Sequence, residues 1–237
     1  MLPAVEYAQV VVPDQRGYGY SDYGGPSQWQ LDTWADDLAT LVDVLGVDRP
    51  VVLGTSFGGF VVQHYLARHP DQPAGAVLVG TSPREGDRAA VIERFRRVGG
   101  ERAAEVMRRA FEDDSEEAER EWAEVCGPLL RRRPPSAAMA SALAHRISTT
   151  EVNLHFMPAL RRMDLRPGLT VAHCPVLVLA GEHDPLIPTQ LAEEIVLALP
   201  EGLGELHLLD ASHTVLNDAP EAAHRLIHQF ARRVTGR

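Results

Sequence analysis

The chain has 237 residues, a mass of 26.0 kDa and a formal net charge of −10. This length suits one α/β domain with a small subdomain, and a hydrophobic content of 45% is normal for a globular protein. The negative charge argues against a nucleic-acid partner, because phosphates require a basic surface. No stretch approaches about 18 consecutive apolar residues, and the first residues lack a basic region and a long apolar run, so we expect neither a membrane span nor a signal peptide.

The first half of the chain alternates between strand and helix patterns. An apolar strand is predicted at Ala8–Val12, and helical spacing of apolar residues follows over 34–45 until Gly46 ends the helix. Pro50–Gly54 and Gly75–Gly80 are continuously apolar, as strands covered on both faces are, and a helix is predicted between them. Strand, helix and strand in this order predict a parallel sheet with right-handed crossovers.

The pattern changes over residues 83–172, where the sequence predicts amphipathic helices and no strand. Helical stripes run over 103–111 and 118–126, the second with Ser115 as its N-cap. A third is predicted after Pro134 and contains Met139, Leu143 and Ile147. We interpret this stretch as a helical lid inserted between two halves of one sheet.

Strands return at Cys174–Ala180 and near Leu206–Leu209, separated by a helix after Pro188. A closing helix is predicted from Pro220, with Asp218-Ala219-Pro220 as its cap. We therefore predict an α/β core formed by residues 1–82 and 173–237, with a mostly parallel sheet and helices on both faces.

Residues Gly54-Thr55-Ser56-Phe57-Gly58 match the Gly-x-Ser-x-Gly pattern and lie between a strand and a helix. A serine in this setting occupies a strained turn, so its glycine neighbours are expected to lack side chains for steric reasons. The helix N-terminus favours negative charge developing near the serine hydroxyl. A glycine-rich turn without chemistry is the alternative, and a phosphate-binding loop is disfavoured because no lysine follows. The context predicts a nucleophile at Ser56.

A serine nucleophile needs a base, and the base needs an acid that holds its tautomer. Asp184 follows the strand Cys174–Ala180, and His213 follows the last strand, so both lie at the carboxyl edge of the sheet in the order Ser, Asp, His. We predict a triad of Ser56, Asp184 and His213, with Glu182 as an alternative acid. His183 and His64 are expected to be solvated or packed residues.

No other cluster of His, Cys and acidic residues has metal-ligand spacing, so we expect no metal and no cofactor. Cys126 and Cys174 lie far apart and are expected to be reduced thiols in a cytoplasmic protein. The expected partner is a small-molecule substrate, and the sequence carries no sign of the oligomeric state. The acidic run at 112–117 is interpreted as a solvated lid face that also has the charge to attract a cationic substrate.

At these residues the sequence resembles the α/β-hydrolase superfamily over nearly its whole length. Its Asp14-Gln15-Arg16-Gly17-Tyr18-Gly19-Tyr20-Ser21 loop looks like that of the proline-iminopeptidase-like branch. The resemblance implies Ser56 as nucleophile, Asp184 as acid, His213 as base and the Phe57 N–H as one oxyanion donor. Two departures weaken the narrower assignment. The branch usually has tryptophan at the position of Phe57, and its lid has glutamates near the segment that here is His155–Leu160, which contains no acidic residue.

Three functions remain open at this stage. The first is hydrolysis of a small ester or amide through an acyl-serine intermediate, and the second is release of an N-terminal proline by an aminopeptidase. The third is a binding protein on a catalytically impaired hydrolase fold. An acyltransferase would use the same triad with another acceptor.

The resemblance also implies a His-Gly oxyanion loop before the Asp14–Ser21 loop, and this sequence lacks it. We therefore expect the second oxyanion donor to be missing and Met1 to be an internal methionine or a misplaced start. On this interpretation a central strand is missing too, so Ala8–Val12 would pair directly with Pro50–Gly54 or leave ladder groups unpaired. The upstream reading frame is expected to encode the missing strands.

Overall fold

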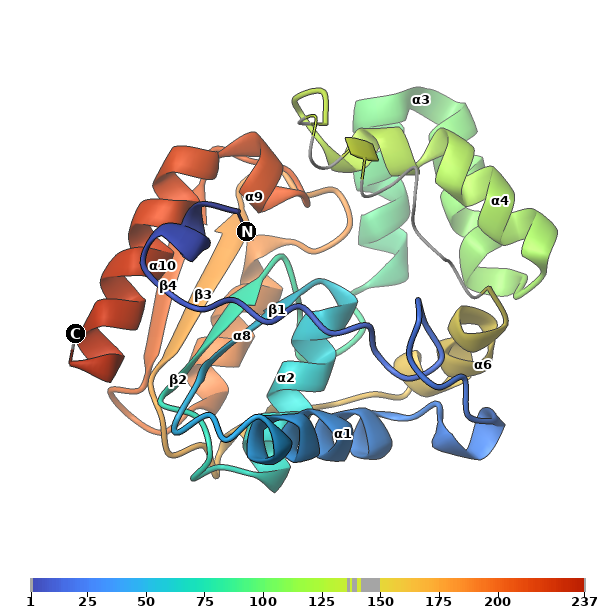
Figure 1. The fold of residues 1–237 in the computed structure, drawn as a ribbon. Coiled ribbons are helices and arrows are strands. Elements are labelled where there is room, and N and C mark those ends of the chain that lie inside the picture. Colours follow the sequence, from blue (N-terminus) through green and yellow to red (C-terminus); the bar gives the residue numbers. More distant parts are fainter. Residues whose placement is uncertain (1, 136, 138–139, 142–149, 237) are drawn as a thin grey trace.

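The protein folds around one parallel β-sheet, seen here in a computed structural model that describes residues 2–135, 137, 140–141 and 150–236. The strand order follows the chain: β1 (Val51–Thr55), β2 (Gly75–Val79), β3 (Val176–Gly181) and β4 (Gly204–Leu209). Each strand pairs in parallel with the next, so every strand presents its carboxyl end at the same edge. Figure 1 shows this sheet between two layers of helices.

Helices cover both faces of the sheet, as the apolar strands predict. One face packs against α1 (Leu31–Val44), α2 (Phe57–Arg68), α7 (Arg166–Leu169) and α8 (Thr189–Ala198). The other face packs against α9 (Val215–Asp218) and α10 (Pro220–Thr235). Successive residues of a strand point to opposite faces, so in β2 the side chain of Leu78 enters the first core and those of Val77 and Val79 enter the second. The predicted α/β class is confirmed.

Among the described residues between β2 and β3 there are three longer helices, which we call the insert helices: α3 (Arg88–Glu112), α4 (Glu116–Val125) and α6 (Thr150–Leu160). Ser115 is the N-cap of α4, as predicted, because its hydroxyl accepts the amide of Ala118. Helix α3 is interrupted at Gly100, whose φ of 75° is left-handed. The predicted stripe of Met139, Leu143 and Ile147 lies outside the described residues. Figure 1 places α3 and α4 together beyond one end of the sheet.

The predicted strand Ala8–Val12 is wrong. These residues have no regular secondary structure, and they follow a short 3-10 helix, η1 (Leu2–Glu6). A strand requires a partner for its backbone groups, and β1 has a described ladder only with β2. Val11 and Val12 are 47% and 68% exposed, while Tyr7 stacks on His228 of α10 at 4.1 Å between ring centroids. Apolar composition alone therefore did not make this segment a strand, and β1 lies at an edge of the described sheet.

Candidate active site

Ser56 lies in the turn between β1 and α2, with a φ of 47° and a ψ of −115°. This backbone conformation is strained for any residue with a side chain. A Cβ on Gly54 would lie 2.3 Å from the carbonyl oxygen of Gly58, so the strand and helix approach closely only because Gly54 has none. A Cβ on Gly58 meets no atom within 4 Å, so the steric expectation is correct for Gly54 and wrong for Gly58. The Phe57 amide begins α2 and has no intrahelical acceptor.

The structure brings the three predicted triad residues together from three loops at the carboxyl edge of the sheet. The Nε2 atom of His213 lies 2.9 Å from Oγ of Ser56. The Nδ1 atom of the same ring lies 2.8 Å from Oδ2 of Asp184. The His213 and Asp184 side chains are 9% and 1% exposed, so water competes little for the bond between them.

The loop after β3 holds the carboxylate of Asp184 in place. Its Oδ1 atom accepts the backbone amides of Leu186 at 2.8 Å and Ile187 at 2.9 Å, while Oδ2 faces the imidazole. The alternative acid, Glu182, is exposed and has no described contact with His213. The geometry favours Asp184 for the acid position.

Two residues that the sequence did not indicate as part of the site, Gly80 and Asp218, hold the His213 loop. A Cβ on Gly80, which has a φ of 54°, would lie 2.8 Å from the carbonyl oxygen of His213. Asp218 is 1% exposed, and its carboxylate accepts the amides of Ser212 at 2.9 Å and Arg132 at 3.1 Å. The predicted cap is correct for Ala219, the N-cap of α10, and for Pro220 in its first turn, but Asp218 makes no side-chain cap bond to the helix. The sequence signal for Gly80 was a glycine directly after a predicted strand. No feature of the sequence near Asp218 indicated its contacts with the His213 loop.

A cavity of about 360 Å³ lies beside Ser56 and under the insert helices. Met107, Phe111 and Trp122 of the insert helices line this cavity. Its other apolar lining residues include Phe57, Phe60, Phe156, Met157 and Leu186. The cavity is therefore suited to an apolar substrate group next to the serine.

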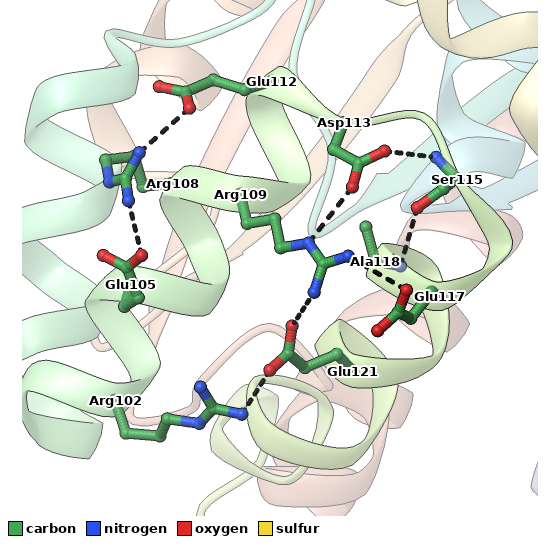
Figure 2. Close-up of polar contacts among 10 residues, drawn as sticks. All are labelled: Arg102, Glu105, Arg108, Arg109, Glu112, Asp113, Ser115, Glu117, Ala118 and Glu121. Carbon is green, nitrogen blue, oxygen red and sulfur yellow. Dashed lines mark hydrogen bonds and ion pairs between the residues drawn. The ribbon is translucent and has the colours of Figure 1, made fainter.

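The acidic run at 112–117 is largely neutralised by arginines, as Figure 2 shows for α3 and α4. Arg109 lies 3.1 Å from Asp113, 3.4 Å from Glu117 and 3.0 Å from Glu121. Hydrogen bonds from Ser115 and Arg109 lower the pKa of the Asp113 carboxyl. Further pairs join Arg108 to Glu112 and Arg161 to Asp114. These acids connect the insert helices to one another, so most of their charge is not available to a substrate.

The remaining histidine candidates, His183 and His64, pair with acids other than Asp184. His183 is exposed, contacts Asp210 at 3.0 Å, and forms with Glu182 and Asp210 the one group of metal-ligand type among the described residues. All three side chains are exposed, and Asp210 is ion-paired with Arg132. His64 of α2 contacts Asp32 of α1 at 2.6 Å.

The Asp14–Ser21 loop has a structural role. Asp14 accepts the backbone amide of Tyr20 at 3.0 Å, and Arg16 binds Asp37 of α1 through two hydrogen bonds of 2.7 Å. Trp34 of α1 donates to the carbonyl of Arg16. The loop thus fixes its own turn and its contact with α1.

The comparisons with known proteins agree with this architecture. The family model described as alpha/beta hydrolase fold matches residues 1–220. The lipase LipV of Mycobacterium tuberculosis (strain ATCC 25618 / H37Rv) is 29% identical over 226 residues, covering 89% of this chain and 78% of LipV. A 2-hydroxymuconate semialdehyde hydrolase of Pseudomonas sp. (strain CF600) is 32% identical over 74 residues, which are 26% of that enzyme.

Solved structures give the same result. A thermophilic esterase from Thermogutta terrifontis superposes with a TM-score of 0.65 at 25% identity, covering 98% of this chain and 82% of the esterase. A proline iminopeptidase from Mycobacterium smegmatis superposes with a TM-score of 0.70 at 21% identity, covering 93% of this chain and 78% of that chain, which shows the fold alone. The chain belongs to the α/β-hydrolase fold family, and it is an enzyme of the hydrolase class.

Among the described residues no helix is long and apolar enough to cross a membrane.

Proposed function

We propose that this protein is a serine hydrolase that cleaves small esters through an acyl-serine intermediate. The observation that carries the proposal is the continuous contact from Ser56 Oγ to His213 Nε2 and from His213 Nδ1 to Asp184, at 2.9 and 2.8 Å. A serine hydroxyl becomes a good nucleophile when a positioned imidazole accepts its proton. Burial of the acid and its two backbone donors keeps the imidazole in one orientation.

In the proposed reaction, Ser56 Oγ attacks the ester carbonyl while His213 Nε2 takes the hydroxyl proton. Asp184 stabilises the imidazolium through Nδ1–H and does not itself take the proton. The Phe57 amide, at the N-terminus of α2, is placed to donate to the oxyanion. No residue of this chain is assigned to the second oxyanion position.

The tetrahedral intermediate then collapses, and the imidazolium protonates the departing alcohol. Water replaces the alcohol and attacks the acyl carbonyl while His213 takes one of its protons. The second tetrahedral intermediate then collapses, the acid leaves, and the imidazolium returns the proton to Ser56 Oγ. The lipase LipV, which the chain resembles over most of its length, supports an ester as the substrate. The apolar lining of the cavity supports an ester with an apolar group. We further propose that residues 83–172 act as the lid over this cavity and that the enzyme works in the cytoplasm.

An aminopeptidase acting on N-terminal proline is less well supported. The likeness to the iminopeptidase is at 21% identity, and most acids of the insert helices are paired with arginines. Equal rates on an amino-acid anilide and its N-acetylated form would exclude it.

The decisive experiment is labelling with a fluorophosphonate, followed by turnover of p-nitrophenyl esters. Wild-type protein should be labelled at Ser56, whereas Ser56→Ala should not be labelled and should lose nearly all turnover. Because triad members act as a unit, the double variant with His213→Ala should be scarcely slower than either single variant. Absence of labelling and of turnover in the wild type would favour the binding-protein alternative, and full activity in Ser56→Ala would refute the proposal.

A further inference from the structure

The cavity lining is mostly apolar and includes several acidic residues. Its acidic lining residues differ in how they are neutralised. Three of them form ion pairs with arginines: Glu85 with Arg88, Asp113 with Arg109, and Asp114 with Arg161. Glu119 of α4 also lines the cavity but has no ion pair with a described arginine. It is therefore the cavity acid whose charge remains uncompensated within the described part of the chain.

The partner of Glu119 is neutral. Its Oε1 atom accepts the side-chain amide of Asn153 at 3.0 Å. The Oδ1 atom of Asn153 accepts the hydroxyl of Tyr18 at 2.6 Å, and this bond orients the amide so that its NH₂ group faces Glu119. Three separate elements, the Asp14–Ser21 loop, α4 and α6, thus hold one carboxylate at the cavity wall.

The second carboxylate oxygen of Glu119 has no partner among the described residues. Its Oε2 atom is buried and accepts no hydrogen bond from them. A buried acceptor without a donor carries an unrecovered desolvation cost, which is larger for a charged group. A donor group on a molecule bound in the cavity would remove this cost after a small rotation of the carboxylate.

We propose that Glu119 is a specificity-determining residue that accepts a hydrogen bond from the substrate. The preferred esters then combine an apolar chain, which fills the cavity, with a hydrogen-bond donor that is separated from the scissile carbonyl. A hydroxyl and an ammonium group both supply this chemistry. This inference rests on the proposed ester hydrolysis and adds the substrate class.

The test compares kcat/KM for matched p-nitrophenyl esters, in a series of acyl-chain lengths, that end in a methyl, a hydroxyl or an ammonium group. At one chain length the wild-type enzyme should prefer a donor-bearing ester over the methyl ester by about 10- to 100-fold, as expected for a hydrogen bond to a charged group. In Glu119→Gln this preference should fall by a similar factor. The hydroxyl and ammonium arms identify which donor is recognised.

Glu117→Gln is the matched control, because Glu117 lies on the same helix, is 73% exposed and pairs with Arg109 outside the cavity. It should keep the wild-type preference. A second measurement needs no variant: short alkanols or alkylammonium ions should inhibit the wild type more strongly than alkyl methyl ethers of equal length.

No preference at any chain length, or an equal preference in wild type and Glu119→Gln, would overturn the role of Glu119. That failure is distinct from failure of the proposed function, because the latter appears as absent fluorophosphonate labelling of wild-type Ser56 and absent hydrolysis of the methyl-ended esters.

Discussion

Replacement of Gly54 by alanine should disrupt the turn that presents Ser56. The added Cβ would lie 2.3 Å from the carbonyl oxygen of Gly58 and 2.8 Å from the amide nitrogen of Gly59. Both are backbone atoms, so neither can rotate away, and ordinary contact distances are about 3.5–4.0 Å. Strand β1 and helix α2 must therefore separate by about 1 Å. Since overpacking costs about 1–3 kcal/mol, we expect a destabilisation near 3 kcal/mol or more, against a typical folding stability of about 5–15 kcal/mol.

The same displacement should lower turnover, because a misplacement of about 1 Å near a reacting group costs about 10²-fold in rate. Urea unfolding measures the stability, and hydrolysis of p-nitrophenyl butyrate measures the rate. Gly58→Ala is the matched control, since its Cβ meets nothing within 4 Å and alanine is favoured over glycine in a helix by about 0.5–1 kcal/mol. The reasoning is refuted if Gly54→Ala unfolds and turns over like wild type, or if Gly58→Ala is equally damaging.

Other substitutions test separate parts of the structure. Ser56→Gly should be more stable than Ser56→Ala by about 1 kcal/mol in thermal or urea unfolding, because glycine adopts the φ of 47° without strain; equal stabilities would contradict the strain. Hydrogen bonds from Arg68 and His69 lower the pKa of Asp36 from 3.8 to about 2, so its contribution to stability is present above pH 3.8 and is lost as the pH falls toward 2. Asp36→Asn should therefore be less stable than wild type at neutral pH by no more than about 1 kcal/mol, because the Arg68–Asp36 ion pair is half exposed. A stability difference that persists below pH 2 would show that it does not come from the ionised carboxylate. Burial raises the pKa of the Cys126 and Cys174 thiols to about 11. Iodoacetamide at pH 8 should therefore alkylate them only after unfolding. Rapid alkylation of the folded protein would contradict this and show that the thiols are accessible.

Local pattern was sufficient for much of the fold. The apolar runs that became β2 and β3 are buried on both faces, and the run that became β1 is buried on one face and partly buried on the other. Such runs differ from the alternating apolar and polar pattern of a strand with one face in solvent. Gly54 in β1 and the serine before α2 marked the turn, because the close approach of strand and helix excludes a Cβ at Gly54. The contact of Ser56, Asp184 and His213 was also predictable, since all follow parallel strands whose carboxyl ends share one edge.

The tertiary structure decided what depends on partners distant in sequence. Ala8–Val12 has the composition of a strand but no ladder partner, so its conformation could not be read from its residues. Asp218 looked like a helix cap, yet its carboxylate binds amides of Ser212 and Arg132, the second of which lies 86 positions away. The contact of Glu119 with Asn153, and of Asn153 with Tyr18, joins three elements separated by up to 135 positions. Hydrogen bonds of this kind depend on how the insert helices pack on the core. The sequence gives the types of the side chains but not the distances between them in the folded protein.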